Sequence, residues 1–189
     1  MMEFEQDIEK ALAILRQGGI LLYPTDTIWG IGCDATNEEA VKRIFALKKR
    51  ADSKALIVLV AEEKDIYAHT AAPDPALLEY LGQCNKPTTA IYEGALGLAE
   101  NLIATDGSIG IRICQDPFCR ALIKRLRKPL VSTSANLSGD NPPTWFGEIH
   151  EAIKAGVDYV VKYRQDDRTP TQASSVVRMK EGRLEVIRP

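Results

Sequence analysis

Histidine and cysteine, which build many metal and nucleophile centres, are scarce in this 189-residue sequence. The two histidines, His69 and His150, lie in segments that offer no other member of a Ser-His-Asp set. The cysteines are scattered along the chain without a C-x-x-C pair: Cys33, Cys84, Cys114 and Cys119. The sequence therefore predicts core thiols, no zinc cluster and no covalent nucleophile.

Long apolar runs are also missing. No stretch approaches the roughly 20 residues needed to cross a bilayer, and the first residues are acidic with helical spacing, unlike a signal peptide. We therefore expect a cytoplasmic protein that does not bind a membrane. Hydrophobic residues make up 45% and charged residues 26% of the chain, an ordinary globular composition, and the length fits one domain over residues 1–189.

The net charge of −2 argues against a generally basic nucleic-acid binder. Basic residues are nevertheless concentrated at positions 42–54 and 120–128. Such a run is commonly the solvated face of a helix, so its position relative to other polar residues has to decide whether it binds a ligand.

Apolar spacing and capping residues predict several helices. A helix over residues 8–15 should end at Gly18, and Thr36 with Glu39 has the spacing of a capping box for a second helix. Two further helix starts place an aspartate before a proline: Asp74-Pro75 and Asp116-Pro117. The second helix should end in basic residues.

Strands are predicted where short apolar and β-branched runs are bounded by turn residues. These runs lie at residues 20–23, 55–61, 88–94, 108–114, 129–135, 158–163, 174–179 and 183–188. Strands alternate with helices early and cluster late, so we expect an α/β fold: a twisted, open, mixed sheet with flanking helices. In the last run, alternation predicts that Leu184, Val186 and Arg188 share one face.

The segment Gly30–Ala35 satisfies the letters of the dinucleotide fingerprint G-x-G-x-x-G/A. That fingerprint needs its first glycine at the end of a strand, whereas Pro24–Trp29 separate the two here. The chain also lacks G-x-x-x-x-G-K-[ST]. A conventional nucleotide-binding fold is disfavoured.

Polar residues gather next to two of the predicted strands. Thr25-Asp26-Thr27 follows the first strand, and Lys48, Arg50 and Lys54 precede the second. Either these segments form an Asx-type turn and a solvated helix end, or the cations hold a polyphosphate through charge-assisted hydrogen bonds.

Small hydrogen-bonding residues also follow the strand at 129–135. They are Ser132, Thr133, Ser134 and Asn136. One interpretation is a turn stabilised by serine and threonine hydroxyls; the other is a set of donors around a phosphate or carboxylate. The residues alone leave both open.

Six segments of the chain occur in an order that is typical of one family. They are "YPTDTIWGIGCDA", "LKKRADSKALIVLV", "SIGIRI", "KPLVSTSANLSG", "SSVV" and the terminal "IRP". In this the chain resembles the YrdC family of threonylcarbamoyl-adenylate synthases from about Ile8 to Pro189, with departures at Ala55, Leu59 and Lys86–Thr89. The resemblance implies an open α/β sheet with a concave, basic face.

The family resemblance also implies a reaction. Members use ATP, L-threonine and bicarbonate to form threonylcarbamoyl-adenylate and pyrophosphate, the first step towards N6-threonylcarbamoyladenosine in tRNA. Mg²⁺ is expected with the ATP, and downstream threonylcarbamoyl-transferase proteins are expected as partners. No side-chain nucleophile is required, which agrees with the scarcity of candidates, because positioning and charge neutralisation can suffice.

Site residues follow from the resemblance by position. Those implied for threonine and bicarbonate are Thr25, Arg112, Ser132 and Ser174. Those implied for ATP are Lys48, Arg50, Lys54, Ser134, Asn136 and Arg188. The metal ligands are not assigned.

A different class of function uses the same basic face. The chain could be a non-catalytic module that binds tRNA or double-stranded RNA through backbone phosphates. We favour the enzyme because a purely electrostatic surface does not need Thr25, Ser134 and Asn136.

Overall fold

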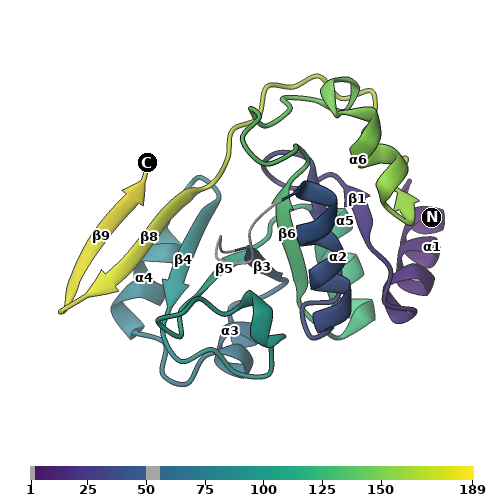
Figure 1. Ribbon diagram of the computed structural model, residues 1–189. Helices are drawn as coiled ribbons and strands as arrows, with labels where there is room; N and C mark the ends of the chain where they lie inside the picture. Colours follow the sequence, from purple (N-terminus) through teal and green to yellow (C-terminus); the bar gives the residue numbers. More distant parts are fainter. Residues whose placement is uncertain (1–2, 50–55) are drawn as a thin grey trace.

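Across residues 3–49 and 56–189, which the computed structural model describes, nine strands form one sheet in the order β7-β1-β2-β6-β3-β5-β4-β8-β9 (Figure 1). The strands are β1 (Leu21–Tyr23), β2 (Gly30–Gly32), β3 (Ile57–Val60), β4 (Thr88–Tyr92), β5 (Ile109–Ile113), β6 (Leu130–Ser134), β7 (Tyr159–Val160), β8 (Ser175–Lys180) and β9 (Arg183–Arg188). The pairs β1–β7, β3–β5 and β4–β8 are parallel, and the other neighbours are antiparallel. The predicted open, mixed sheet is confirmed.

Helices lie on both faces of this sheet. They are α1 (Glu5–Arg16), α2 (Glu38–Lys48), α3 (Lys64–His69), α4 (Pro75–Gln83), α5 (Pro117–Leu126) and α6 (Glu151–Gly156), with short 3-10 turns η1 (Glu100–Leu102) and η2 (Phe146–Glu148). The predicted aspartate caps are confirmed, since the Asp74 carboxylate accepts the Ala76 N–H and the Asp116 carboxylate accepts the Cys119 N–H. Gly18 ends α1 with a φ of +77°. Sequence patterns missed α3 and α6, which are only six residues long.

The start of α2 differs from the prediction. The Asn37 side chain, and not Thr36, caps this helix by accepting the Ala40 N–H at 3.0 Å. Thr36 instead donates its N–H and its hydroxyl to Asp34, at 2.8 and 2.7 Å. Glu39 forms an exposed ion pair with Lys42. The capping-box prediction is wrong because asparagine, an equally good cap, stands one residue later.

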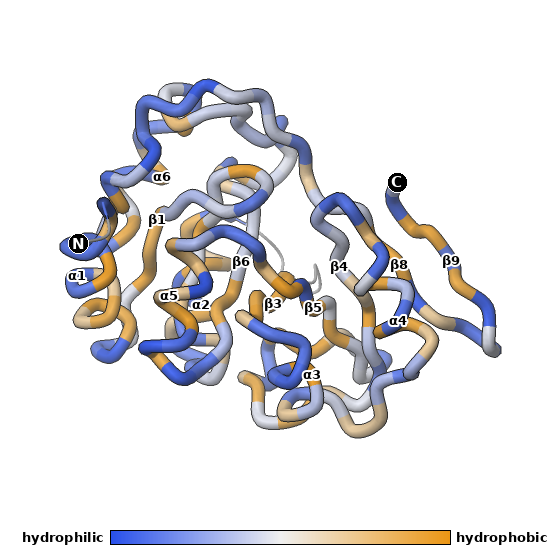
Figure 2. The backbone as a smooth tube through the Cα atoms, turned by 180° about the vertical axis from the view of Figure 1, so that it is seen from behind, coloured by the Kyte–Doolittle hydropathy of each residue, from blue (hydrophilic) through white to orange (hydrophobic). Residues whose placement is uncertain are grey.

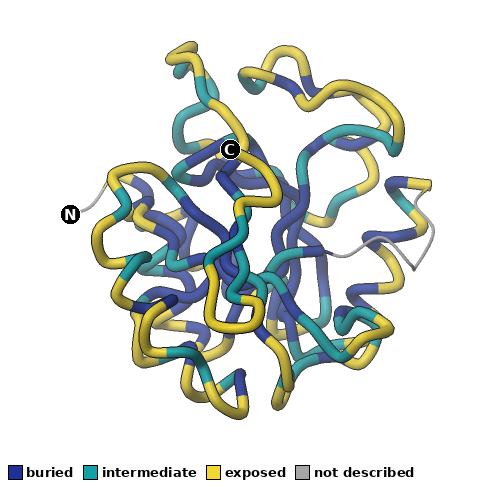
Figure 3. Tube along the Cα trace, turned by 90° about the vertical axis from the view of Figure 1, so that its left-hand side faces the viewer, coloured by how far each residue is buried: buried dark blue, intermediate teal, exposed yellow. Residues whose placement is uncertain are grey.

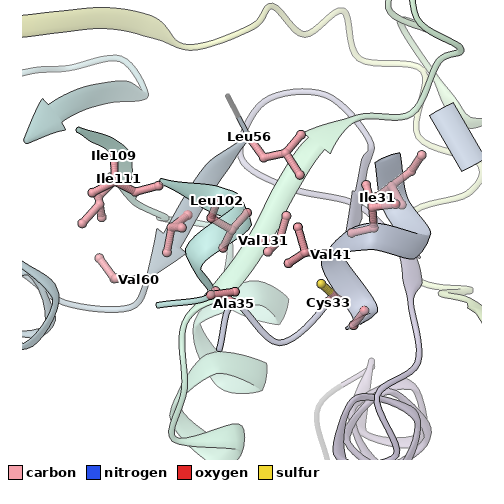
Figure 4. Packing of buried hydrophobic residues seen from close by; sticks show 14 of the residues in the cluster. Ile31, Cys33, Ala35, Val41, Leu56, Val60, Leu102, Ile109, Ile111 and Val131 are labelled. Atoms are coloured by element: carbon pink, nitrogen blue, oxygen red, sulfur yellow. The ribbon is translucent and has the colours of Figure 1, made fainter. Parts of the chain in front are cut away.

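Two hydrophobic cores lie against opposite faces of the sheet. One packs α1 and α5 against Leu21, Leu59 and Leu130. The other packs α2 and α4 against alternate strand residues such as Ile31 and Val131, which Figure 4 shows together with Val41 from α2. Figure 3 shows the strands in the middle of the molecule as its most buried part. The period-two alternation along each strand therefore separates the cores.

Sequence patterns also missed β2, which occupies the glycine pair of the supposed fingerprint. Gly32 pairs with Leu21 of β1, and a Cβ there would lie 2.1 Å from the Val131 carbonyl oxygen and 2.7 Å from the Tyr23 ring. The Tyr23 hydroxyl uses this space to donate to the same carbonyl at 2.8 Å. The glycine therefore serves sheet packing, and the rejection of a dinucleotide fingerprint is consistent with this strand.

The last strand contains a bulge. Val177 pairs with Val186, but Val176 pairs with Arg188, so Ile187 is an extra residue in β9. Because neighbouring residues of β8 face opposite sides, Arg188 lies on the opposite face from Val186. The prediction that Leu184, Val186 and Arg188 share one face is wrong for Arg188.

Candidate functional site

A cavity of about 180 Å³ lies on one face of the sheet, where β2, β3, β5 and β6 run side by side. Its lining residues come from these strands, from the turn before β2 and from the two C-terminal segments: Thr27, Ile28, Trp29, Gly30, Leu56, Ile57, Arg112, Ser132, Thr133, Ser134, Pro142, Ala173, Ser174 and Arg188. Five of the predicted site residues are therefore at one cavity: Arg112, Ser132, Ser134, Ser174 and Arg188.

The pairing register places the polar side chains on the same face. Arg112 pairs with Leu59, and Ser132 pairs with Ile57, two residues earlier on β3. Leu59 belongs to the core beneath α1 and α5. The cavity therefore lies on the sheet face that α1 and α5 cover, next to the apolar core beneath them.

Gly30 lines this cavity, and its lack of a side chain leaves space there. A Cβ at this position would lie 3.0 Å from the Ser132 Oγ and 3.6 Å from the Thr25 Cγ2. Any side chain here would crowd the serine hydroxyl. The glycine is consistent with a close approach of a ligand to the backbone.

Arg112 is the most buried cation in the cavity wall, with 3% of its surface exposed. Its Nη2 lies 3.1 Å from the Asp26 Oδ1, and the Asp26 Oδ2 accepts the Gln115 N–H at 2.9 Å. Within the described residues, the Arg112 Nε has no hydrogen-bond partner. A buried donor left in this state costs about 1–3 kcal/mol, so the guanidinium is suited to a carboxylate or phosphate from a ligand.

Thr25 lies behind the cavity wall and is not among its lining residues. Its hydroxyl donates to the Ile28 carbonyl at 2.8 Å and accepts the Thr27 N–H at 3.0 Å. The Thr27 hydroxyl lies 3.0 Å from the same oxygen and does reach the lining. In this structure the Thr25 hydroxyl bonds within the turn, and Thr27 is the threonine of this segment that lines the cavity. The sequence placed Thr27 in the same polar segment but gave no reason to prefer it.

Lys48 is buried, with 1% exposed, although it ends a helix that was expected to present positive charge to solvent. Its ammonium donates to the carbonyl oxygens of Ser134 and Asn136, the latter at 2.7 Å, and its own carbonyl accepts the Ser138 N–H at 2.9 Å. The helix end therefore meets the loop after β6 and not the Thr25 turn. Arg50 and Lys54, the other predicted phosphate ligands, lie outside the described residues.

Asn136 lies on that same loop. Its Nδ2 donates to the carbonyls of Leu137 and Asp140, at 2.8 and 2.9 Å. The Oδ1 is buried and has no hydrogen-bond partner in the described part of the chain. The two bonds from Nδ2 fix the Asn136 side chain, and they leave its Oδ1 acceptor unpaired among the described residues.

Ser174 joins the last two strands to the cavity. Its hydroxyl lies 2.8 Å from the Thr89 hydroxyl, and its carbonyl accepts from the Arg188 Nε and Nη2, at 3.0 and 2.7 Å. The bulge in β9 is what brings the Arg188 side chain to this face. Thr89 stands in the segment that departs from the family pattern, and sequence reasoning missed its contact with Ser174.

Sequence comparison places the chain among known proteins. The Sua5/yciO/yrdC family profile, described as telomere recombination, matches residues 13–189. The chain belongs to this family. Threonylcarbamoyl-AMP synthase from Coxiella burnetii is 33% identical over 143 residues, 75% of this chain and 77% of the relative. The enzyme of the same name from Xanthomonas campestris pv. campestris is 34% identical over 164 residues, 85% and 87% of the two chains.

Solved structures of the family share the fold. P. abyssi Sua5 complexed with L-threonine superimposes with a TM-score of 0.84 at 24% identity, covering 98% of this chain and 54% of that one. E. coli YciO gives a TM-score of 0.80 at 22% identity, covering 97% and 88%. The chain thus spans about half the length of P. abyssi Sua5 and most of YciO. None of the helices in the described residues is long and apolar enough to span a membrane.

Proposed function

We propose that this member of the Sua5/yciO/yrdC family is an L-threonylcarbamoyladenylate synthase, which forms threonylcarbamoyl-AMP and pyrophosphate from ATP, L-threonine and bicarbonate. The curated relatives that are 33–35% identical carry the name of this activity. The observation in the fold that supports it best is the buried Arg112, which lines a small cavity together with serine and threonine hydroxyls and whose Nε has no hydrogen-bond partner among the described residues.

The amino-acid substrate fits the Arg112 end of the cavity. Its carboxylate would accept from the Arg112 guanidinium, and the hydroxyls of Thr27 and Ser132, which line the same cavity, would orient the amine and the side-chain hydroxyl. Asp26 keeps the guanidinium in place from the side opposite the ligand. Such fixed donors lower the barrier by positioning the reactants.

The chemistry then needs no side-chain nucleophile. Bicarbonate takes up a proton and loses water to give carbon dioxide, the neutral amine of threonine adds to it, and the adduct loses a proton to give a carbamate. A carbamate oxygen attacks the α-phosphorus of ATP, the bond to the β-phosphate oxygen breaks, and pyrophosphate leaves with the electron pair. The protein contributes orientation and charge neutralisation along this path.

The nucleotide would lie towards the loop after β6 and the end of β9. Ser134 and Arg188 line the cavity, and Asn136, which is not among the lining residues, follows Ser134 on the loop. Lys48, by donating hydrogen bonds to the carbonyls of Ser134 and Asn136, would keep this loop in the conformation that binds the nucleotide. Direct contacts from Arg50 and Lys54 to the phosphates remain part of the proposal.

A metal ion fits this arrangement only as a companion of the nucleotide. Among the described residues no group of three or more His, Cys, Asp or Glu side chains could hold a metal, and Asp26 is engaged by Arg112 and the Gln115 N–H. Mg²⁺ is bound in many enzymes mainly by substrate phosphates and water. It would supply charge neutralisation at the phosphates.

Partners beyond the substrates belong to this proposal too. The product would pass to a threonylcarbamoyl-transferase acting on tRNA, in the cytoplasm. Direct binding of tRNA or double-stranded RNA to the sheet face is a separate property. A module that bound RNA through charge alone would have no use for a buried arginine facing a hydroxyl-lined cavity of about 180 Å³.

The direct test is substrate omission. The purified protein is incubated with ATP, L-threonine and bicarbonate, each is left out in turn, and pyrophosphate is measured together with the adenylate by chromatography. The proposal predicts release only in the complete mixture. Pyrophosphate release that ignores threonine would contradict it.

A further inference from the structure

The guanidinium of Arg164, in the segment after β7, joins three parts of the chain that meet behind the cavity. Its Nη1 donates to the Thr25 carbonyl at 3.0 Å and to the Asp116 Oδ2 at 2.9 Å, and its Nε donates to the Asp167 Oδ2 at 3.0 Å. The segment from 161 onwards crosses the top of the molecule to β8 (Figure 1), and Figure 2 shows the chain at the top of the molecule as largely hydrophilic. One side chain therefore ties the turn before β2, the start of α5 and this crossing segment together.

We infer that Arg164 is a positioning residue for the amino-acid side of the site, acting through Asp26 on Arg112; this inference rests on the proposed synthase function. Asp26 lies in the chain next to Thr25, whose carbonyl Arg164 holds. Its Oδ2 accepts the N–H of Gln115, which is the residue before Asp116. Arg164 thus holds the chain on both sides of the Asp26 carboxylate: at Thr25, the residue before Asp26, and at Asp116, the residue after Gln115.

The surroundings of Arg164 are built for a lasting contact. Asp116 is 4% exposed and caps α5 through its other oxygen, which accepts the Cys119 N–H at 2.9 Å. Burial raises the pKa of Asp116, while the Cys119 N–H and the Arg164 guanidinium act in the opposite direction. Removing either Arg164 or Asp116 would leave the other group as a poorly solvated charge without its ion-pair partner.

The backbone at Arg164 supports the same conclusion. Its φ is +63°, in the left-handed region that non-glycine residues rarely adopt. Residues held in such conformations are kept there by their surroundings and are concentrated at functional sites. Here the contacts of the guanidinium, together with the Asp167 N–H that donates to the Arg164 carbonyl at 3.2 Å, hold it.

The segment that follows Arg164 leads to the cavity. Asp167 accepts the Thr169 N–H at 2.9 Å, and the chain then runs on to Ala173 and Ser174, which line the cavity. Arg164 is therefore placed to couple the Thr25 turn with the opposite cavity wall. Its effect should fall on the ligand bound between them and much less on the ATP phosphates.

The test compares two substitutions at this position with a control in the same segment. In Arg164→Met the charge and the hydrogen bonds are lost, and in Arg164→Lys the charge is kept. Arg168→Met is the control, because Arg168 stacks on the Trp145 ring at 4.4 Å and, among the described residues, no hydrogen bond or ion pair joins it to the turn. We measure threonine and ATP binding separately by calorimetry, KM and kcat for each substrate, and the melting temperature.

The expected result for Arg164→Met is a rise of about tenfold or more in the Kd and KM for threonine, with the Kd for ATP changed by less than about twofold. Arg164→Lys should recover part of the loss, and Arg168→Met should bind threonine like the parent. Equal losses for threonine and ATP, or a lowered melting temperature with unchanged threonine affinity, would overturn the inference and leave Arg164 a structural residue.

A second variant covers the case in which Arg164→Met does not fold. Asp116→Asn keeps an oxygen that can cap α5 but removes the charge that faces Arg164, and the inference predicts a smaller rise in the threonine Kd in the same direction. Unchanged threonine affinity in Asp116→Asn would then count against it. The parental protein separates the two proposals: if it releases no threonine-dependent pyrophosphate, the synthase function fails whatever the variants do.

Discussion

Replacing Arg112 by glutamine tests the centre of the proposed site most directly. The change removes a buried positive charge but keeps a polar side chain. It leaves the Asp26 carboxylate, whose side chain is 8% exposed, with the Gln115 N–H as its one hydrogen-bond partner among the described residues. Removing one partner of a buried ion pair costs about 3–5 kcal/mol. Because that N–H still compensates part of the charge, we expect Arg112→Gln to lower the free energy of unfolding by about 3 kcal/mol.

The double variant Asp26→Asn/Arg112→Gln separates stability from binding. Without either charge the pair is neutral, so the double variant should be more stable than the sum of the single effects predicts, by at least about 1 kcal/mol. Threonine binding should not return, because the carboxylate ligand is still missing. In both variants that lack Arg112 we expect a loss of about a hundredfold in threonine affinity, or about 2.7 kcal/mol.

The assays are urea unfolding for stability and calorimetry for threonine. Arg120→Gln is a matched control, since Arg120 is a more exposed arginine whose guanidinium donates to the Gln115 side chain at 3.3 Å. It should leave both quantities near the parental values. A threonine affinity in the double variant equal to that of the parent would refute the assignment of Arg112. A cost below about 1 kcal/mol in Arg112→Gln would refute the reasoning about burial.

Three further predictions concern other parts of the molecule. Arg188→Ala should weaken ATP binding at least about tenfold with little change in the melting temperature, and Arg188→Lys should recover only part, because lysine cannot form two parallel hydrogen bonds; parental turnover in the alanine variant would contradict this. Gly30→Ala should raise the KM for threonine several-fold without unfolding the protein, since the new methyl group would lie 3.0 Å from the Ser132 hydroxyl; an unchanged KM would show that ligands do not approach this strand. Glu62, which pairs with Lys124 and Lys64, has its pKa lowered to about 2 from 4.5, so its contribution to stability should be complete above about pH 5 and lost as the pH falls towards 2. The difference in urea midpoint between the parent and Glu62→Gln should shrink over that range, and a constant difference would contradict the lowered pKa.

The sequence by itself determined the features that depend on near neighbours. The aspartate caps at Asp74 and Asp116 and the glycine stop at Gly18 act within four residues of the helix ends they define, so their letters were enough. The eight predicted strand runs each overlap an observed strand, because apolar alternation is also a local property. The ordered motifs identified the family and pointed to Arg112, Ser132, Ser134, Ser174 and Arg188, which the fold brings to one cavity.

Only the tertiary structure decided how these residues are used. Lys48 was expected at the ATP phosphates, and only the fold shows that its ammonium donates to carbonyls 86 and 88 positions away. The role of Thr25 towards a ligand stays a prediction, but only the fold shows that its hydroxyl bonds within its own turn and that Thr27 lines the cavity. Arg188 faces the site because of one extra residue at Ile187, which no alternation pattern could reveal.

The physical reason is the range of the interactions. A cap or an alternating strand is fixed by a few residues in sequence, whereas a buried charge takes its partner from whatever the fold places beside it. Asp26 meets the Gln115 N–H across 89 positions, and Arg164 meets the Thr25 carbonyl across 139. Desolvation makes each of these charges depend on finding that partner, so the sequence could name the charged residues of the site, and only the folded sheet could pair them.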